Sequence, residues 1–204
     1  MKKRFYHNGQ YICDYESTGD EMKDIAIVNQ IAMERGLDHR PVTTVEAMFQ
    51  QANSFAATGA ALFEKLNARP PDQMAIAPFV VNTAFSLELY MKVLALQHGK
   101  KLHGHELSTL FRKLPGAAKQ EIERQLAALR ETSRWSAGIK TFSDLANVAA
   151  SLNTAFVDWR YSYEQPSRPL RIDFQPTIFL GEVLHASVGA GFEATTASFK
   201  SATP

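Results

Sequence analysis

The chain of 204 residues lacks the features that mark secreted or membrane-embedded proteins. Its single cysteine, Cys13, excludes an intrachain disulfide and favours a reducing compartment. The basic start of the chain is followed by polar and aromatic residues and not by the apolar segment of a signal peptide. No apolar run approaches bilayer-spanning length, since residues 178–192 are too few and include Glu182 and His185. These absences predict a soluble, cytoplasmic protein that does not engage a membrane.

An excess of charge and the common catalytic motifs are also missing. Lys and Arg number 22 and Asp and Glu 21, which gives a formal net charge of +1, so any nucleic-acid site must be a local basic patch. The chain has no glycine-rich phosphate loop, His-Glu-x-x-His motif, cysteine cluster or nucleophile elbow. His103 and His105 lack a suitably spaced acidic partner, so we expect neither a metal nor a cofactor.

Apolar residues recur at helical spacing along most of the chain, which predicts a mainly all-α protein. We expect helices over residues 20–35, 44–69, 77–98, 105–114, 117–132, 142–163 and 177–199. Thr43 or Thr44 can cap the second of these, and Ser143 the sixth. Asn8-Gly9 between aromatic and β-branched residues predicts a hairpin over residues 4–15, and the alternation at residues 171–174 predicts a further strand beside it.

These elements predict one domain with three parts. Residues 1–42 form an N-terminal hairpin and helix, and residues 43–164 form an antiparallel helical bundle. Residues 165–204 contribute an extended segment and a C-terminal helix that packs on the bundle. The expected fold class is therefore all-α with a small β appendage.

The helix over residues 77–98 carries an unusual distribution of polar side chains. At 100° per residue one side gathers a set that we expect to face solvent, namely Asn82, Thr83, Ser86 and Gln97. Glu88 and Lys92 fall on the opposite, apolar arc, one helical turn apart. Burying an unpaired charge is costly, so both should pair with each other or with another element.

The helix over residues 142–163 offers a partner. Arg160 and Tyr163 continue its apolar stripe after Phe156, so we expect Arg160 to meet Glu88, with Lys92, Tyr163 and His105 nearby. Two interpretations stay open: a structural ion pair, which is the more common case in helical bundles, and a binding site. For His105 taken alone, capping of the helix that follows is the simpler interpretation.

These stretches resemble HEPN domains, helical modules shared by many nucleotide- and RNA-handling proteins. The resemblance covers about residues 45–164 and depends on the order FSLELYMK at 85–92, a basic loop, GHELSTLF at 104–111 and Trp-Arg-Tyr at 159–161. It implies an RNA, nucleotide or protein partner and a homodimer. Many members resemble metal-independent ribonucleases with an Arg-x4–6-His motif, whereas others are similar to non-catalytic partners or binding modules.

The ribonuclease motif is incomplete in this chain. If Arg160 is the matching arginine, the histidine should fall at Gln165, Pro166 or Ser167, and it does not. The acid–base group that cleavage through the 2′-hydroxyl needs is then missing from its expected place. A phenol is almost wholly protonated at neutral pH, so Tyr163 is a poor substitute.

The sequence therefore predicts a non-catalytic or divergent HEPN-like domain that binds RNA, a nucleotide or a protein partner. The expected site comprises Glu88, Lys92, His105, Arg160 and Tyr163, with Lys92 and Arg160 as anion contacts. Lys100, Lys101, Arg112 and Lys113 either add to an RNA- or phosphate-binding surface or are simply solvated. Two alternatives remain: a toxin- or defence-type metal-independent ribonuclease with a rearranged site, using Arg160, His105 or Tyr163, and an antitoxin-like or scaffold protein.

Overall fold

A computed structural model of the chain describes residues 1–7, 10–37, 42–136, 138–153 and 172–201, with side chains up to residue 192. It is mostly helical with one small two-stranded antiparallel sheet, as the sequence predicted. The contacts divide the chain into two compact units, Met1–Val42 and Thr43–Pro204, where the sequence patterns predicted one domain. Each unit is described by itself.

The N-terminal unit consists of a hairpin and a helix. Strand β1 (Lys2–His7) pairs with β2 (Gln10–Glu16), and α1 (Glu21–Glu34) follows. The Asp20 carboxylate begins α1 by accepting hydrogen bonds from the amides of the first turn. The predicted third strand is wrong, because the chain after residues 172–173 enters a helix at Phe174.

A network of hydrogen bonds connects the hairpin to α1. The carboxylate of Asp24, which is 4% exposed, accepts hydrogen bonds from Ser17 Oγ at 2.5 Å, Thr18 N at 2.7 Å and Lys3 Nζ at 2.9 Å. These donors, with Ser17 and then Lys3 contributing most, hold the pKa of Asp24 well below its usual range. The unit is thus held together in large part by an ionised carboxylate.

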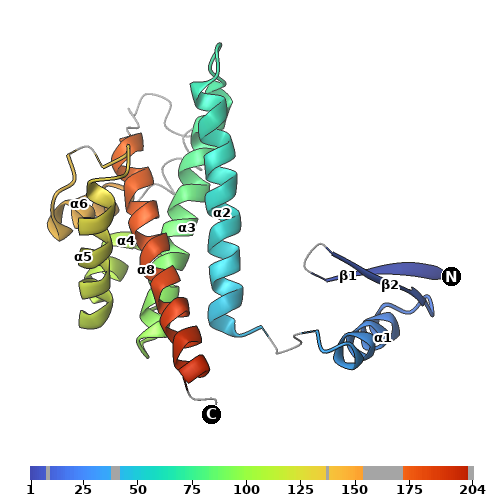
Figure 1. The fold of residues 1–204 in the computed structure, drawn as a ribbon. Helices are drawn as coiled ribbons and strands as arrows, with labels where there is room; N and C mark the ends of the chain where they lie inside the picture. Colours follow the sequence, from blue (N-terminus) through green and yellow to red (C-terminus); the bar gives the residue numbers. More distant parts are fainter. Residues whose placement is uncertain (8–9, 38–41, 137, 154–171, 202–204) are drawn as a thin grey trace. The chain divides into compact units, whose positions relative to one another are not determined.

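The second unit is a set of packed helices (Figure 1). They are α2 (Thr44–Asn67), the 3₁₀ turn η1 (Gln73–Ala75), α3 (Ile76–Gln97), α4 (Leu107–Lys113), α5 (Gly116–Arg130), α6 (Phe142–Ser151) and α8 (Phe174–Ser201). Helices α2 and α3 lie side by side and run in opposite directions, and α8 packs along α3 and also contacts α5 and α6. Helix α3 therefore lies at the centre of the packing.

The starts of two helices follow from capping boxes. Thr43 and Glu46 form one at the start of α2, as the sequence suggested. For α6 the cap is Thr141 and not the predicted Ser143, because Asp144 stands three residues after Thr141 and completes the reciprocal pair. Such a box satisfies two amides at once, which a lone serine cannot do.

Two helix boundaries differ from prediction. Helix α4 begins at Leu107 and not at residue 105. The predicted helix over residues 142–163 is wrong as one unbroken element, because α6 ends at Ser151 and the next two residues form a turn. Arg160 and Tyr163 therefore do not continue the apolar stripe of α6, and both residues lie outside the described part of the chain.

The predicted solvent face of α3 is also wrong. Thr83 is 8% and Ser86 2% exposed, and Ser86 Oγ donates to the Thr83 carbonyl oxygen at 2.8 Å. Neighbouring helices surround α3, so its small hydroxyl side chains are enclosed with the apolar ones. Contrary to prediction, residues 73–97 are long and apolar enough to cross a membrane by length and composition. Of the 18-residue window within them that meets this test, 67% is buried in the structure. This is the burial expected of a core helix.

Candidate functional site

Three of the five predicted site residues come together around one buried carboxylate. Glu88, on α3, is 7% exposed, and its Oε1 accepts a hydrogen bond from Lys92 Nζ at 2.7 Å. The same oxygen lies 2.9 Å from Nδ1 of His105. The helical spacing of four residues explains the first contact, and the loop that leads from α3 to α4 brings the second. The predicted pair of Glu88 and Arg160 stays a prediction, because Arg160 lies outside the described residues.

The cluster is buried at one end and open at the other. The side chain of Glu88 is 10% exposed and that of Lys92 17%, whereas that of His105 is 82% exposed. Lys92 neutralises the Glu88 carboxylate inside the protein, and the imidazole of His105 is the part of the cluster that lies at the surface. A buried acid therefore fixes the orientation of an exposed histidine.

His105 does not cap α4, because its ring is turned toward Glu88. The amide of Ser108, in the first turn of α4, donates instead to Oδ1 of Asn153 at 2.7 Å. Asn153 Nδ2 in turn donates to Ser108 Oγ at 2.8 Å and to Glu106 Oε1 at 3.2 Å. Asn153 thus ties the end of α6 to the start of α4, next to His105. Sequence analysis missed this residue, because nothing local links positions 45 residues apart.

Basic side chains gather around α4. Lys100 Nζ donates to the carbonyl oxygen of Lys113 at 2.6 Å, and Lys119 Nζ donates to that of Arg112 at 2.7 Å. Both ammonium groups lie at the C-terminal end of the helix, where its dipole favours positive charge. We define the α4 basic surface by its exposed cationic and imidazole side chains, namely Lys100, Lys101, His103, His105, Arg112 and Lys113.

This surface is compact and almost free of acidic groups. A helix of seven residues such as α4 is about 10 Å long, so the imidazole of His105 before its start and the cations at its C-terminal end lie within reach of one ligand. Residues 98–119 contain five Lys or Arg and one acid, Glu106, a net charge of +4, whereas the whole chain carries +1. The positive charge of the helical unit is therefore locally concentrated here.

The arrangement allows two kinds of chemistry. Lysines, an arginine and exposed imidazoles can contact phosphate groups. A histidine held through Nδ1 by a carboxylate, with its other ring nitrogen available, also has the geometry of a general base. Among the described residues no group of three or more His, Cys, Asp or Glu side chains has the arrangement of a metal site.

Comparison of the chain with protein-family models, with curated proteins and with solved structures finds no match. The resemblance to HEPN domains therefore depends on the sequence features alone, of which the structure describes the motifs at residues 85–92 and 104–111 and the basic loop between them. Glu88, Lys92 and His105 all come from these two motifs, and the structure brings them into one cluster. That a ligand binds there stays a prediction.

Proposed function

We propose that the protein is a HEPN-like RNA-binding module that contacts the phosphate backbone through the α4 basic surface. The observation that carries this proposal is the concentration of exposed cations in and beside one short helix, in a chain of nearly neutral charge. Contacts to phosphate supply most of the affinity in sequence-independent RNA binding. The other ligands that the sequence left open, a nucleotide or a protein partner, are outcomes of the test below.

The Glu88 cluster has a supporting part in this function. Lys92 is already paired with Glu88 inside the protein, so it serves mainly to neutralise the buried acid. His105 is exposed and held in one orientation, and a planar imidazole can stack on an unpaired base or hydrogen-bond to a phosphate. The buried carboxylate therefore pre-organises a ligand-contacting side chain.

Binding of a fluorescent, mixed-sequence single-stranded RNA to the full chain tests the proposal by fluorescence anisotropy. The Lys101→Ala/Lys113→Ala double variant should bind roughly tenfold more weakly at low salt. It should also lower the slope of log K against log salt by about 1.4, since each phosphate contact on a single strand contributes about 0.7.

The matched control is Lys65→Ala/Lys140→Ala, which removes two exposed lysines outside the α4 basic surface. It should bind RNA nearly as well as the unaltered chain. Equal losses in the two double variants, or no RNA binding by the unaltered chain, would show that this surface is not an RNA site. Unlabelled RNA and a nucleoside triphosphate can each be added as competitors of the fluorescent RNA. If the triphosphate displaces it at concentrations where unlabelled RNA does not, the ligand of this surface is a nucleotide.

A second candidate function, metal-independent RNA cleavage, is favoured by the contact between His105 and Glu88. In this function His105 Nε2 takes the proton of a 2′-hydroxyl while the carboxylate holds the ring. Incubation with RNA in the presence of a chelator tests it. Cleavage that disappears in His105→Gln and in Arg160→Ala, with RNA binding retained, supports the enzyme, and intact RNA with the unaltered chain excludes it under those conditions.

A further inference from the structure

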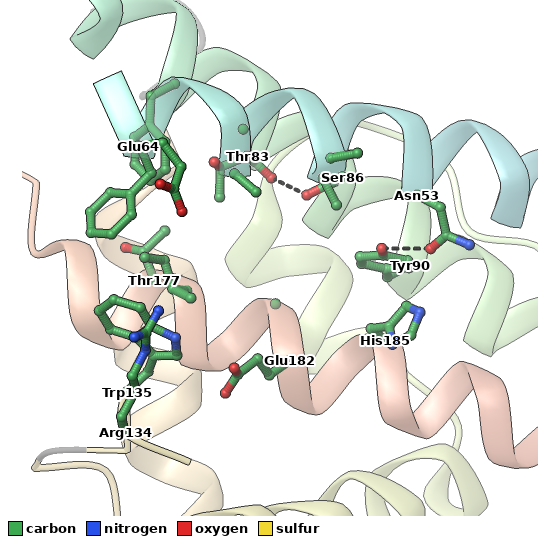
Figure 2. A pocket seen from close by; sticks show the side chains of 18 residues that line it. Asn53, Glu64, Thr83, Ser86, Tyr90, Arg134, Trp135, Thr177, Glu182 and His185 are labelled. Atoms are coloured by element: carbon green, nitrogen blue, oxygen red, sulfur yellow. Dashed lines mark hydrogen bonds between the residues drawn. The ribbon is translucent and has the colours of Figure 1, made fainter. Parts of the chain in front are cut away.

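A cavity of about 520 Å³ lies between α2, α3 and α8, and it shares no residue with the Glu88 cluster or the α4 basic surface. Its volume falls within the range of roughly 300–1,000 Å³ that is usual for small-molecule sites. Figure 2 shows Glu64, Arg134 and Trp135 at one end of this cavity, Tyr90, His185 and Asn53 at the other, and Glu182 between them.

The wall formed by α3 is a stripe of buried polar residues. Thr83, Ser86 and Tyr90 recur at intervals of three and four residues and are 8%, 2% and 2% exposed. All three line the cavity, and Tyr90 Oη donates to Asn53 Oδ1 at 2.8 Å across it (Figure 2). A polar stripe inside a helical core is costly unless its members are hydrogen-bonded, and the hydroxyls of Ser86 and Tyr90 donate within the protein. The stripe gives the cavity a polar wall.

The other walls combine small and aromatic residues. At Gly59 a Cβ atom would come within 3.0 Å of Thr83 Oγ1, so glycine permits the close approach of α2 and α3 at this point. The rings of Phe63 and Trp135 meet edge to face with centroids 5.4 Å apart, and Arg134 lies 4.4 Å from the Trp135 ring centroid. Phe63 and Trp135 therefore give this end of the cavity an aromatic wall, part of which the Arg134 guanidinium covers.

The charge of the cavity selects against anions. Glu64 and Glu182 line it, whereas Arg134 is its one guanidinium or ammonium group among the residues the structure describes there. Glu182 Oε2 accepts a hydrogen bond from Ser133 Oγ at 2.5 Å, which fixes the carboxylate in place. Counting Asp, Glu, Lys and Arg side chains, the lining carries two negative charges and one positive, so a ligand with one positive charge is favoured over a phosphate.

We propose that this cavity binds a small aromatic amine. The ring packs against Phe63 and Trp135, and the ammonium group pairs with Glu182. The ligand of the cavity is thus opposite in charge to that of the α4 basic surface, and the two sites do not compete.

Calorimetric titration of the full chain with 2-phenylethylamine and with phenylacetate tests the proposal, because these probes share a ring and differ in charge. We expect saturable binding of the amine alone. Glu182→Gln should weaken it about tenfold, while the same charge change at exposed Glu123, outside the cavity, leaves it unaltered.

A second pair of variants tests the location. Ala60 is exposed and lines the cavity, so Ala60→Phe should block amine binding without unfolding the protein, and Ala61→Phe, at the exposed neighbouring position, should not. Equal binding of phenylacetate, no saturable binding of the amine, or unchanged binding in Ala60→Phe would each overturn the proposal. Circular dichroism of each variant confirms that the helices are formed.

Discussion

Each unit of the protein buries one prominent carboxylate, and the two are used differently. Asp24 of the N-terminal unit is enclosed by donors from the hairpin and the turn that follows it. Glu88 of the helical unit is paired with Lys92 on one side and with an exposed imidazole on the other. Asp24 therefore joins elements within its own unit, whereas Glu88 also contacts an exposed imidazole, to which the proposed function assigns a ligand contact.

The two units also differ in what stabilises them. Among the described residues of the N-terminal unit, Phe5 and Ala32 are its buried hydrophobic residues. The helical unit has a continuous apolar core that extends over α2 to α8. Burial of apolar side chains is therefore the main source of stability in the helical unit. In the hairpin and α1, hydrogen bonds to the Asp24 carboxylate have a larger share.

The largest expected effect is the loss of a core side chain of the helical unit. Leu87, on α3, is fully buried, so Leu87→Ala should lower the free energy of unfolding by about 3 kcal/mol through lost transfer energy and a cavity. Urea denaturation followed by circular dichroism measures it. Met74→Ala, at a side chain that is 85% exposed, is the control and should change the midpoint little. Similar losses in both would contradict a core centred on α3.

A smaller effect is expected at Glu88. Glu88→Ala leaves the mostly buried ammonium of Lys92 without its partner, so we expect a loss of about 1–3 kcal/mol. Glu88→Gln should cost less, since its amide oxygen still accepts from Lys92. The same urea experiment measures both, and Glu123→Ala, at an exposed position, serves as reference. If the alanine variant is as stable as the unaltered chain, the cluster does not hold Lys92 and His105 in place.

The most local effect is expected on acidification. The pKa of Asp24 is lowered in the folded unit, so its stabilising contribution is present above the unfolded value of about 3.9 and is lost as the pH falls through the folded value. The protection factors of the amides of β1 and β2 in the full chain, which compare each exchange rate with the intrinsic rate at the same pH, should therefore fall below about pH 4.

Two variants sharpen this prediction. Asp24→Asn should make the hairpin amides exchange faster already at neutral pH and remove most of the acid dependence, because the ionised acceptor is gone. Glu34→Gln changes an exposed carboxylate on the same helix and should leave the exchange profile as it was. Acid sensitivity that persists in Asp24→Asn would assign it to another group.

Local signals predicted much of the fold. Some helix ends are marked by contacts within a few residues, namely the capping pair of Thr43 and Glu46 before α2 and the glycine after α3. The structure confirms both helices. The end of α6 at Ser151 has no Gly or Pro signal, so periodicity alone extended it too far. Polar Thr83 and Ser86 were assigned to solvent because one helix viewed alone does not reveal how many neighbours surround it.

The sites divide in the same way. The contact of Glu88 with Lys92 follows from helical spacing, so it could be predicted from the sequence. The position of Asn153 beside α4 and the cavity between three helices depend on packing between distant segments, which no local pattern specifies. Sequence analysis therefore found the charged cluster and missed the cavity.

The most direct test of the central claim is an NMR titration of the full, isotope-labelled chain with single-stranded RNA. If RNA binds the α4 basic surface, the shifted amides concentrate at residues 98–119 and the ring signals of His105 move with them. The hairpin is the internal comparison, since exposed Tyr6 and Tyr11 lie beside basic Arg4 and offer another surface for nucleic acid. Shifts that concentrate in β1 and β2, with residues 98–119 unchanged, would show that RNA does not bind the α4 basic surface.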